Sequence, residues 1–401
     1  QGRATGDYSF GANFTQGPNA QSASAAAGDG FASFLLGLGS GTLTHNFKII
    51  NTNSQYWAGY LQDDWKVTTK LTLNLGLRYD LFLPRKERFD RQNFLDLAAP
   101  SPLAGPSGLP NLRGGLAYTG VGGAPRTQMD TNYHDFAPRL GFAYQMTKRL
   151  VIRGGAGIFF SNQPSEAAAT VGATGFRTDT SYLGTIDSVT PNNYISDPFP
   201  GGVFLPVTGS ALGLMTNVGQ GVSAPLRSSP STYMQNWNFG VQYQLPSNWL
   251  VDAAYSGSHG LNLIYGPSWN QLPVESLSLG AQLLQNVPNP FYRLITSSGA
   301  LSGQQVQRRY LMAPFPQFSG VSWGYQPGAT SQYHSIQVRV EKRFSSGLSL
   351  LASFTGGKLM DDSSSNNGNF NTNGTSQDAN NRHGEWSLST ADISRRLVVS
   401  A

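Results

Sequence analysis

Residues that could perform acid–base or metal chemistry are few and scattered along the chain. A zinc site needs Glu-x-x-His or His-x-x-x-His spacing, and none of the five histidines has it. Each is expected to lie in a polar interior, a turn or a loop; they are His45, His134, His259, His334 and His383. The sequence contains no cysteine, which excludes disulfides and thiolate–metal centres.

The sequence also lacks the residue spacing of nucleophile and phosphate-binding motifs. The segment 256–260, Ser-Gly-Ser-His-Gly, lacks the Gly-x-Ser-x-Gly order of a nucleophile elbow. The glycine-rich segments 37–41 and 153–157 lack the Lys-Ser/Thr pair of a phosphate loop. Inside a strand, Gly154, Gly155 and Gly157 are expected to permit bending or the close approach of another segment. We therefore expect neither an enzyme nor a bound cofactor.

One acidic stretch, Asp361–Asn369, carries oxygen ligands of the kind calcium prefers. Its sequence is Asp-Asp-Ser-Ser-Ser-Asn-Asn-Gly-Asn, without the spacing of an EF-hand, which needs a bidentate glutamate at its twelfth position. A plain solvated loop is the favoured interpretation and calcium binding is the alternative. No metal ligand is assigned.

The composition narrows the class of protein. Charged residues make up 12% of the 401 residues, about half of what a soluble globular protein carries. No window approaches 18 uncharged apolar residues, so a membrane-spanning helix is not expected. The net charge of +5 comes without a run of lysine and arginine, so nucleic acid is not an expected partner. Neither end of the chain has the features of a natural terminus, and we expect a piece of a longer protein.

Period-two alternation is the dominant structural signal, and it predicts β-strands in pairs. The clearest segment is Tyr233–Leu245, with Trp237, Phe239 and Val241 on one face and polar residues between them. Four hairpins are predicted, with strands at 56–67 and 71–80, 136–146 and 150–160, 233–245 and 249–258, and 335–344 and 348–359. An opening strand near Tyr8–Phe14 and a final strand near Ile393–Ala401 bring the expected number to about ten.

The connections between these strands alternate strictly between short and long. Turns of about three residues close each hairpin, whereas the links 84–132, 161–231, 260–331 and 360–390 run to tens of residues. Short turns at one end and long loops at the other are typical of an outer-membrane barrel. The predicted fold is therefore all-β: part of an antiparallel up-and-down transmembrane β-barrel. A soluble sandwich or propeller is the alternative, but its regular turn spacing or fixed repeat is missing.

Charge placement tests this interpretation, because a charged side chain facing lipid at mid-depth costs about 2–4 kcal/mol. Lys342 falls on the apolar register beside a turn, where its stem can reach the interface. Asp63 also falls there, and a bulge between Gln62 and Asp64 would correct its register. The residues expected to face the lumen are Arg78, Asp80, Arg139, Arg153, Asn236, Asn238, Gln242, Asp252, Arg339 and Glu341.

The predicted hairpins resemble the barrel of a TonB-dependent outer-membrane receptor, and more narrowly the Oar-like group. The most specific stretch runs from Gln62 to Asp80, and similar stretches occur at 31–37, 136–144 and 153–160. The resemblance implies a complete barrel of 22 strands, an internal plug and energy supplied through TonB. Residues 1–401 would then be part of the barrel domain, with the plug, the regulatory-like N-terminal domain and the C-terminal strands outside this chain.

Three functions follow from these expectations. The leading one is TonB-dependent uptake of a large nutrient through the outer membrane of a Gram-negative bacterium. Its expected partners are outer-membrane lipid, the TonB complex acting through the parent's plug, and an unidentified siderophore, glycan or peptide. The alternatives are an adhesive surface protein that transports nothing and a secreted, soluble glycan-binding domain.

Overall fold

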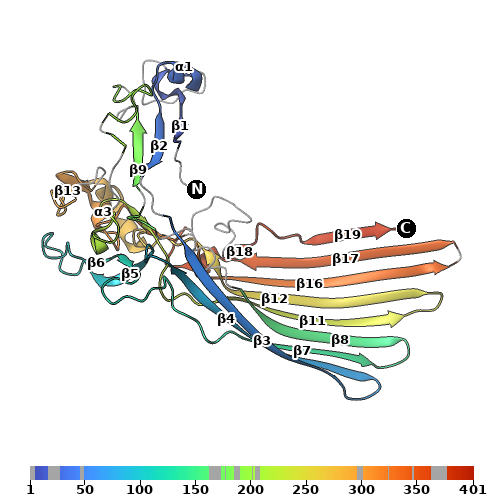
Figure 1. Ribbon diagram of the computed structural model, residues 1–401. Coiled ribbons are helices and arrows are strands. Elements are labelled where there is room, and N and C mark those ends of the chain that lie inside the picture. Colours follow the sequence, from blue (N-terminus) through green and yellow to red (C-terminus); the bar gives the residue numbers. More distant parts are fainter. Residues whose placement is uncertain are drawn as a thin grey trace. The chain divides into compact units, whose positions relative to one another are not determined.

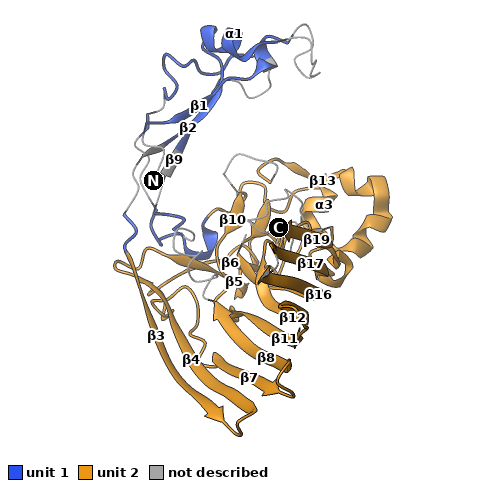
Figure 2. Ribbon diagram, turned by 90° about the vertical axis from the view of Figure 1, so that its right-hand side faces the viewer, with its two compact units in different colours: residues 1–51, 173–216 blue, residues 52–172, 217–401 orange. Residues whose placement is uncertain are grey.

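A computed structural model describes residues 5–16, 28–45, 49–161, 173–176, 178–184, 190–200, 202–203, 208–295, 301–323, 325–345, 347–362 and 377–401. The chain divides into two compact units. Unit 1 comprises residues 1–51 and 173–216, and unit 2 comprises residues 52–172 and 217–401 (Figure 2).

Unit 2 is built on one antiparallel sheet of ten strands. Its four hairpins match the predicted ones in order and in turn position. The sheet strands are β3 (Thr52–Lys66), β4 (Leu71–Glu87), β7 (Phe136–Gln145), β8 (Leu150–Ser161), β11 (Thr232–Gln244), β12 (Trp249–Tyr265), β16 (Gln326–Ser345), β17 (Leu348–Asp361), β18 (Ser387–Leu388) and β19 (Arg395–Ser400). Strands β4, β12 and β16 extend further than predicted, at the ends away from the tight turns.

The strands follow one another across the sheet in chain order, from β3 at one edge to β17, which pairs with both β18 and β19. Figure 1 shows the hairpin turns at one end of the sheet and the longer connections at the other. The sheet is curved but does not close, because β3 and β19 are not paired with each other. It is therefore part of a barrel wall, as predicted.

Neighbouring strands are staggered along their length. One row of directly paired residues runs from Asp63 on β3 through Leu140 and Trp237 to Lys358 on β17. Asp63 lies four positions from the turn at Val67, whereas Lys358 lies ten positions from the turn at Leu348. If the turns lie at one level, that stagger over seven strand-to-strand steps corresponds to a tilt of about 30°, near the tilt of barrel strands.

The described residues of three long connections of unit 2 fold together into what we call the loop crown, residues 88–135, 217–231, 266–295, 301–323 and 325. It contains the pairs β5 (Asn93–Pro100) with β6 (Arg113–Tyr118), β13 (Asn286–Pro288) with β14 (Gln305–Gln307), and β10 (Gly221–Ser223) parallel to β15 (Gly320–Ser322). It also contains the 3-10 segment η4 (Val274–Leu284) and the short helix α3 (Arg308–Leu311). A further 3-10 turn, η5 (Arg382–Glu385), precedes β18.

The loop crown has its own buried core, so these connections are not structureless. Trp323 packs with Met129 and Trp269, which come from two different connections. The side-chain amide of Gln317, itself fully buried, donates to the Arg113 carbonyl at 2.7 Å. Other fully or nearly fully buried crown residues are Leu116, Phe291, Leu301 and Val321.

Unit 1 contains a separate three-stranded sheet, β1 (Asp7–Ser9), β2 (Ser40–His45) and β9 (Thr178–Leu183). The prediction that Tyr8–Phe14 opens the barrel sheet was wrong: β1 pairs with β2, and 3-10 turn η1 (Ala12–Phe14) follows. The apolar stretch after Asp29 forms helix α1 (Gly30–Leu35), capped by the Asp29 carboxylate, and a 3-10 turn η3 spans Gly213–Met215. No helix among the described residues is long and apolar enough to cross a membrane.

Candidate functional site: the polar face of the sheet

All ten residues predicted to face the lumen lie on one face of the sheet. Directly paired residues on antiparallel strands point to the same side, so the register can be followed from strand to strand. Gln242 pairs with Asp252, and Asp252 pairs with Arg339. The same ladder joins Arg139 to Gly157 and Gly157 to Asn236. We call this side of the sheet the polar face.

Most charges on the polar face are paired. Arg339 donates to Glu341 at 2.8 Å, and Arg343 lies 3.7 Å from the same carboxylate. Arg153 forms an ion pair with Asp252, two strands away. Pairs of this kind in contact with water contribute about 0–1 kcal/mol each, so they fix side-chain positions more than they stabilise the fold.

A denser network lies where the polar face meets the loop crown. Arg78 donates to Asp80 at 2.8 Å, and the Tyr56 hydroxyl also donates to Asp80. The nearby Asp135, which precedes β7, is only 1% exposed and accepts a hydrogen bond from Ser231 at 2.7 Å. Burial raises the pKa of the Asp135 carboxyl, and the charge of Asp80 adds to that shift, while the Ser231 hydrogen bond and His134 oppose it.

Arg139 differs from Arg78, Arg153 and Arg339, which form ion pairs. Its neighbours in the ladder are two glycines, Gly76 on β4 and Gly157 on β8, and its side chain lies over Gly157, where an added Cβ would come within 3.2 Å of the Arg139 Cγ. The guanidinium stacks 4.5 Å from the centroid of the Phe159 ring, and no ion pair to it is found among the described residues. A hollow of about 310 Å³ lies beside it, lined also by Tyr60, Gln62 and Arg78. A cation with no ion pair in the described part of the chain, beside a polar hollow, suits a negatively charged or hydrogen-bonding ligand.

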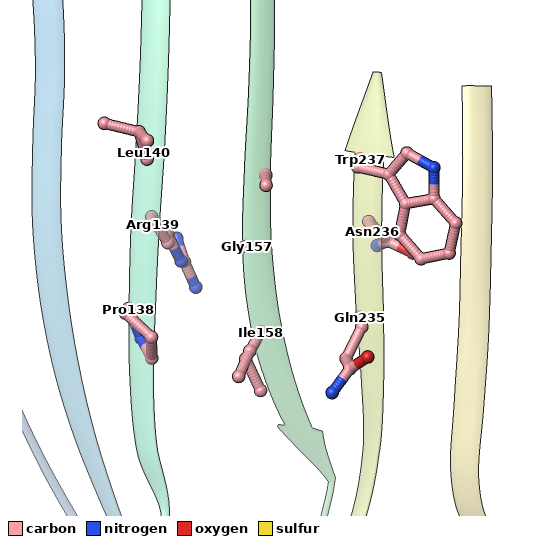
Figure 3. Close-up of a pocket in the computed structure, with 9 residues that line it drawn as sticks. Pro138, Arg139, Leu140, Gly157, Ile158, Gln235, Asn236 and Trp237 are labelled. Atoms are coloured by element: carbon pink, nitrogen blue, oxygen red, sulfur yellow. The ribbon is translucent and has the colours of Figure 1, made fainter. Parts of the chain in front are cut away.

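The opposite face, which we call the apolar face, pairs aromatic rings with glycines. Gly154 is the direct partner of both Phe142 and Phe239, and a Cβ at position 154 would lie 2.8 Å from the Phe142 ring. Trp237 extends from β11 toward β12 and covers Gly257 (Figure 3). Gly154, one of the β8 glycines predicted to allow bending or the close approach of another segment, is thus covered by neighbouring aromatic rings.

A hollow of about 370 Å³ on β7, β8 and β11 is shown in Figure 3. Most of its lining side chains belong to the apolar register, among them Pro138, Leu140, Ile158 and Trp237. It is a shallow feature of the apolar surface with no cluster of chemically reactive side chains.

The two charges noted from sequence as breaking the alternation are accommodated differently; Lys358, opposite His334, also lies on the apolar register. The Lys342 ammonium donates to the Ser247 carbonyl at 3.3 Å and lies over the Trp249 ring, which confirms that it reaches the turn. The bulge proposed near Asp63 is wrong, because pairing is continuous from Gln55 to Lys66 and sets Asp63 opposite Leu75 on the apolar face. The stagger of the sheet brings Asp63 close to the tight-turn end, where the cost of its charge is small.

The histidines and acids that the structure describes do not assemble into a reactive centre. Contrary to expectation, His259 and His334 lie on the apolar register of β12 and β16, where His334 Nδ1 is 2.6 Å from the Tyr255 hydroxyl. Of the acidic stretch, Asp362 binds the Thr330 backbone amide at 2.6 Å, and residues 363–369 lie outside the described residues. Within the described ranges no group of three or more metal-ligating side chains is found.

Sequence reasoning missed the functional features that depend on the loop crown and the turns. Asp135 was not singled out, because an acid before a strand carries no signal of burial. Arg149 and Arg343 were passed over as turn and strand-end residues, although both line a hollow together with the polar-face residues Gln242 and Gln244. The available signal was the period-two alternation, because Arg149 is four residues from Arg153 and Arg343 is four residues from Arg339.

A strongly alternating, tilted sheet with one charged face, one aromatic face and folded loops at one end defines a membrane-spanning β-barrel wall. The sequence matches the family described as "outer membrane beta barrel domain" over residues 1–401. The chain belongs to this family, and its place is the outer membrane of a Gram-negative bacterium. The alternative of a secreted soluble domain is thereby set aside.

Solved structures with a similar arrangement include the outer membrane transporter YddB from Escherichia coli, at 10% identity and a TM-score of 0.36, covering 83% of this chain and 26% of YddB. P. aeruginosa FpvA bound to pyoverdines has 10% identity and a TM-score of 0.34, covering 87% of this chain and 26% of FpvA. For the alcaligin receptor FauA from Bordetella pertussis the values are 10% and 0.32, covering 82% and 39%. The comparison with curated proteins found no match.

The chain thus spans about a quarter of the length of YddB and FpvA. The activity, ligand and partners of the whole protein are accordingly matters for proposal.

Proposed function

We propose that residues 1–401 form part of the barrel domain of a TonB-dependent outer-membrane receptor that imports a large nutrient. In this proposal the polar face lines the lumen, the apolar face contacts lipid, and the loop crown faces the cell exterior. Energy would reach the barrel through the parent's plug and the TonB complex. The plug, the regulatory-like N-terminal domain and the C-terminal strands lie outside this chain.

The observation that carries the proposal is the separation of side chains between the two faces of one continuous sheet. The ten polar residues predicted from sequence share a face, whereas Leu140, Phe239 and Ile336 lie exposed on the other. An amide left without a partner in lipid costs several kcal/mol, and a wet or polypeptide-filled lumen supplies partners. The Arg139 guanidinium, which has no ion pair among the residues that the structure describes, lies beside a polar hollow and supports contact with a ligand or plug on that face.

Cysteine scanning of β11 in the full-length parent tests which face is wet. Asn236→Cys, Asn238→Cys and Gln242→Cys should react with a water-soluble maleimide, whereas Trp237→Cys, Phe239→Cys and Val241→Cys should react poorly and be quenched by a lipid-phase probe. The two sets alternate along one strand, so each set is the control for the other. Uniform reactivity along β11, or the reverse alternation, would refute the proposed orientation.

An adhesive role without transport is the second candidate, and the folded core of the loop crown favours it, since it forms a defined surface. Uptake measurements on candidate nutrients separate the two functions. A strain lacking the parent should lose uptake of at least one siderophore, glycan or peptide under the transport proposal. Unchanged uptake of all of them, together with lost cell adhesion, would favour the surface role.

A further inference from the structure

A second hollow lies on the polar face, at the tight-turn end of the sheet. Its volume is about 210 Å³. The lining residues come from β8, β11, β12, β16 and their turns: Lys148, Arg149, Val151, Gln242, Gln244, Asn248, Trp249, Leu250 and Arg343. These strands are central in the sheet, so strands added at either edge would not fill or reshape it.

The charge of this hollow is one-sided. Three lining residues are cations and none is an acid. On the polar face of these four strands and their turns, five cations (Lys148, Arg149, Arg153, Arg339 and Arg343) accompany only two carboxylates, Asp252 and Glu341. Asp252 is engaged by Arg153, and Glu341 is shared between Arg339 at 2.8 Å and Arg343 at 3.7 Å. The hollow therefore collects the positive charge that this part of the sheet does not neutralise.

The backbone holds the two arginines on opposite sides of the β11–β12 hairpin. The Gln244 amide donates to the Arg149 carbonyl at 2.8 Å, and the Arg343 amide donates to the Asn248 carbonyl at 3.1 Å. The turn between them is tight, with Ser247 and Asn248 at φ of 57° and 62°. Amide side chains of Gln242, Gln244 and Asn248 line the space between, and each can donate hydrogen bonds.

We propose that this hollow is an oxyanion-binding site that takes a single phosphate or carboxylate group. Arginine forks and amide donors are the groups that bind such oxygens most strongly, and the volume suits one small anionic group rather than a whole nutrient. The group belongs either to a free anion or to an acidic side chain of a polypeptide segment. Only the location of the site inside the lumen rests on the proposed function.

Phosphate binding to the full-length parent in detergent tests the free-anion source. Calorimetric titration with inorganic phosphate should show saturable binding that weakens at least tenfold in Arg149→Gln and in Arg343→Gln. Lys70→Gln, in the turn between β3 and β4, is the matched control and should leave binding unchanged. Binding that persists equally in both arginine variants would overturn the proposal.

Photo-crosslinking from the hollow tests the polypeptide source. With Gln244→p-benzoylphenylalanine, an occupying acidic segment should crosslink within the same protein, and Arg149→Gln combined with Arg343→Gln should abolish the crosslink. Phosphate binding without a crosslink identifies a free anion, and a crosslink without phosphate binding identifies a carboxylate-bearing segment. Absence of both would refute the oxyanion site. Cysteine labelling of β11 is independent of both readouts, so failure of the proposed function is distinguishable.

Discussion

Arg153 on β8 reaches across the intervening strand β11 to pair with Asp252 on β12. The residue of β11 opposite Arg153 is Gly240, whose other partner is Ala254. The crossing therefore starts beside a residue of β11 that has no side chain. The ion pair links two strands that share no backbone hydrogen bonds.

A double-mutant cycle should detect this link. Arg153→Gln and Asp252→Asn each remove one partner, and their coupling in urea unfolding of the parent should be about 0.5–1 kcal/mol, typical of a pair in contact with water. The coupling should shrink at high salt. The same cycle on Arg78 and Gln242, which are not paired, is the control and should show no coupling.

Gly257 should tolerate no side chain while Trp237 is present. A Cβ at position 257 would lie 2.5 Å from the indole of Trp237, so Gly257→Val must displace the ring. We expect Gly257→Val to lower the yield of folded, heat-modifiable barrel, and Trp237→Ala to restore part of that yield in the double variant. A double variant that folds worse than Gly257→Val alone would show that the ring is not the obstacle.

Trp323 should be required for the loop crown but not for the sheet. It is 1% exposed and packs with Met129 and Trp269, so Trp323→Ala should cost about 3–5 kcal/mol of crown stability. Limited proteolysis should then cut within 266–325 while the strands stay protected. Trp323→Phe is the control: the indole N–H makes no hydrogen bond, so its loss should be tolerated. Cleavage unchanged in Trp323→Ala would contradict the crown core.

Asp135 should make the polar network less stable as pH rises. Its pKa is raised in the folded protein, mainly by burial, so the folded state holds the proton more tightly than the unfolded state. The stabilisation is complete below the unfolded pKa of about 3.9 and is lost as pH rises through the higher folded value.

The Asp135→Asn variant should flatten this dependence. Its amide stays neutral, and the Ser231 hydroxyl can rotate to accept a hydrogen bond from it. In denaturant unfolding of the parent, the free energy of unfolding of the variant relative to the wild type should be higher at pH 8 than at pH 4. An equal difference at both pH values would mean that Asp135 titrates as an exposed acid.

The barrel sheet could be predicted from sequence because its two signals are local. Alternation along Tyr233–Leu245 sets which side chains share a face, and the three-residue turns set the register between hairpin partners. Pairing between hairpins follows chain order, so alternation alone predicts that Arg139, Asn236 and Asp252 share one face.

What depends on distant contacts was not predictable. The strand at Asp7–Ser9 alternates like a barrel strand, but its partner β2 lies in unit 1. Asp135 and Ser231 are 96 residues apart in sequence, and nothing local indicates their hydrogen bond. The crown core likewise joins Met129 to Trp323 across two hairpins.

Because the strands are staggered, each row of directly paired residues on the polar face follows a helical path around the barrel axis and does not stay at one depth. Stepping from one paired residue to the next, as from Gln242 to Asp252 to Arg339, changes depth by about one residue rise per strand. A bound molecule that stays at one depth therefore meets side chains that are not ladder partners. Conversely, a molecule that moves from one ladder partner to the next would rotate about the barrel axis as it changes depth. The sequence in which it meets these side chains is therefore coupled to its depth.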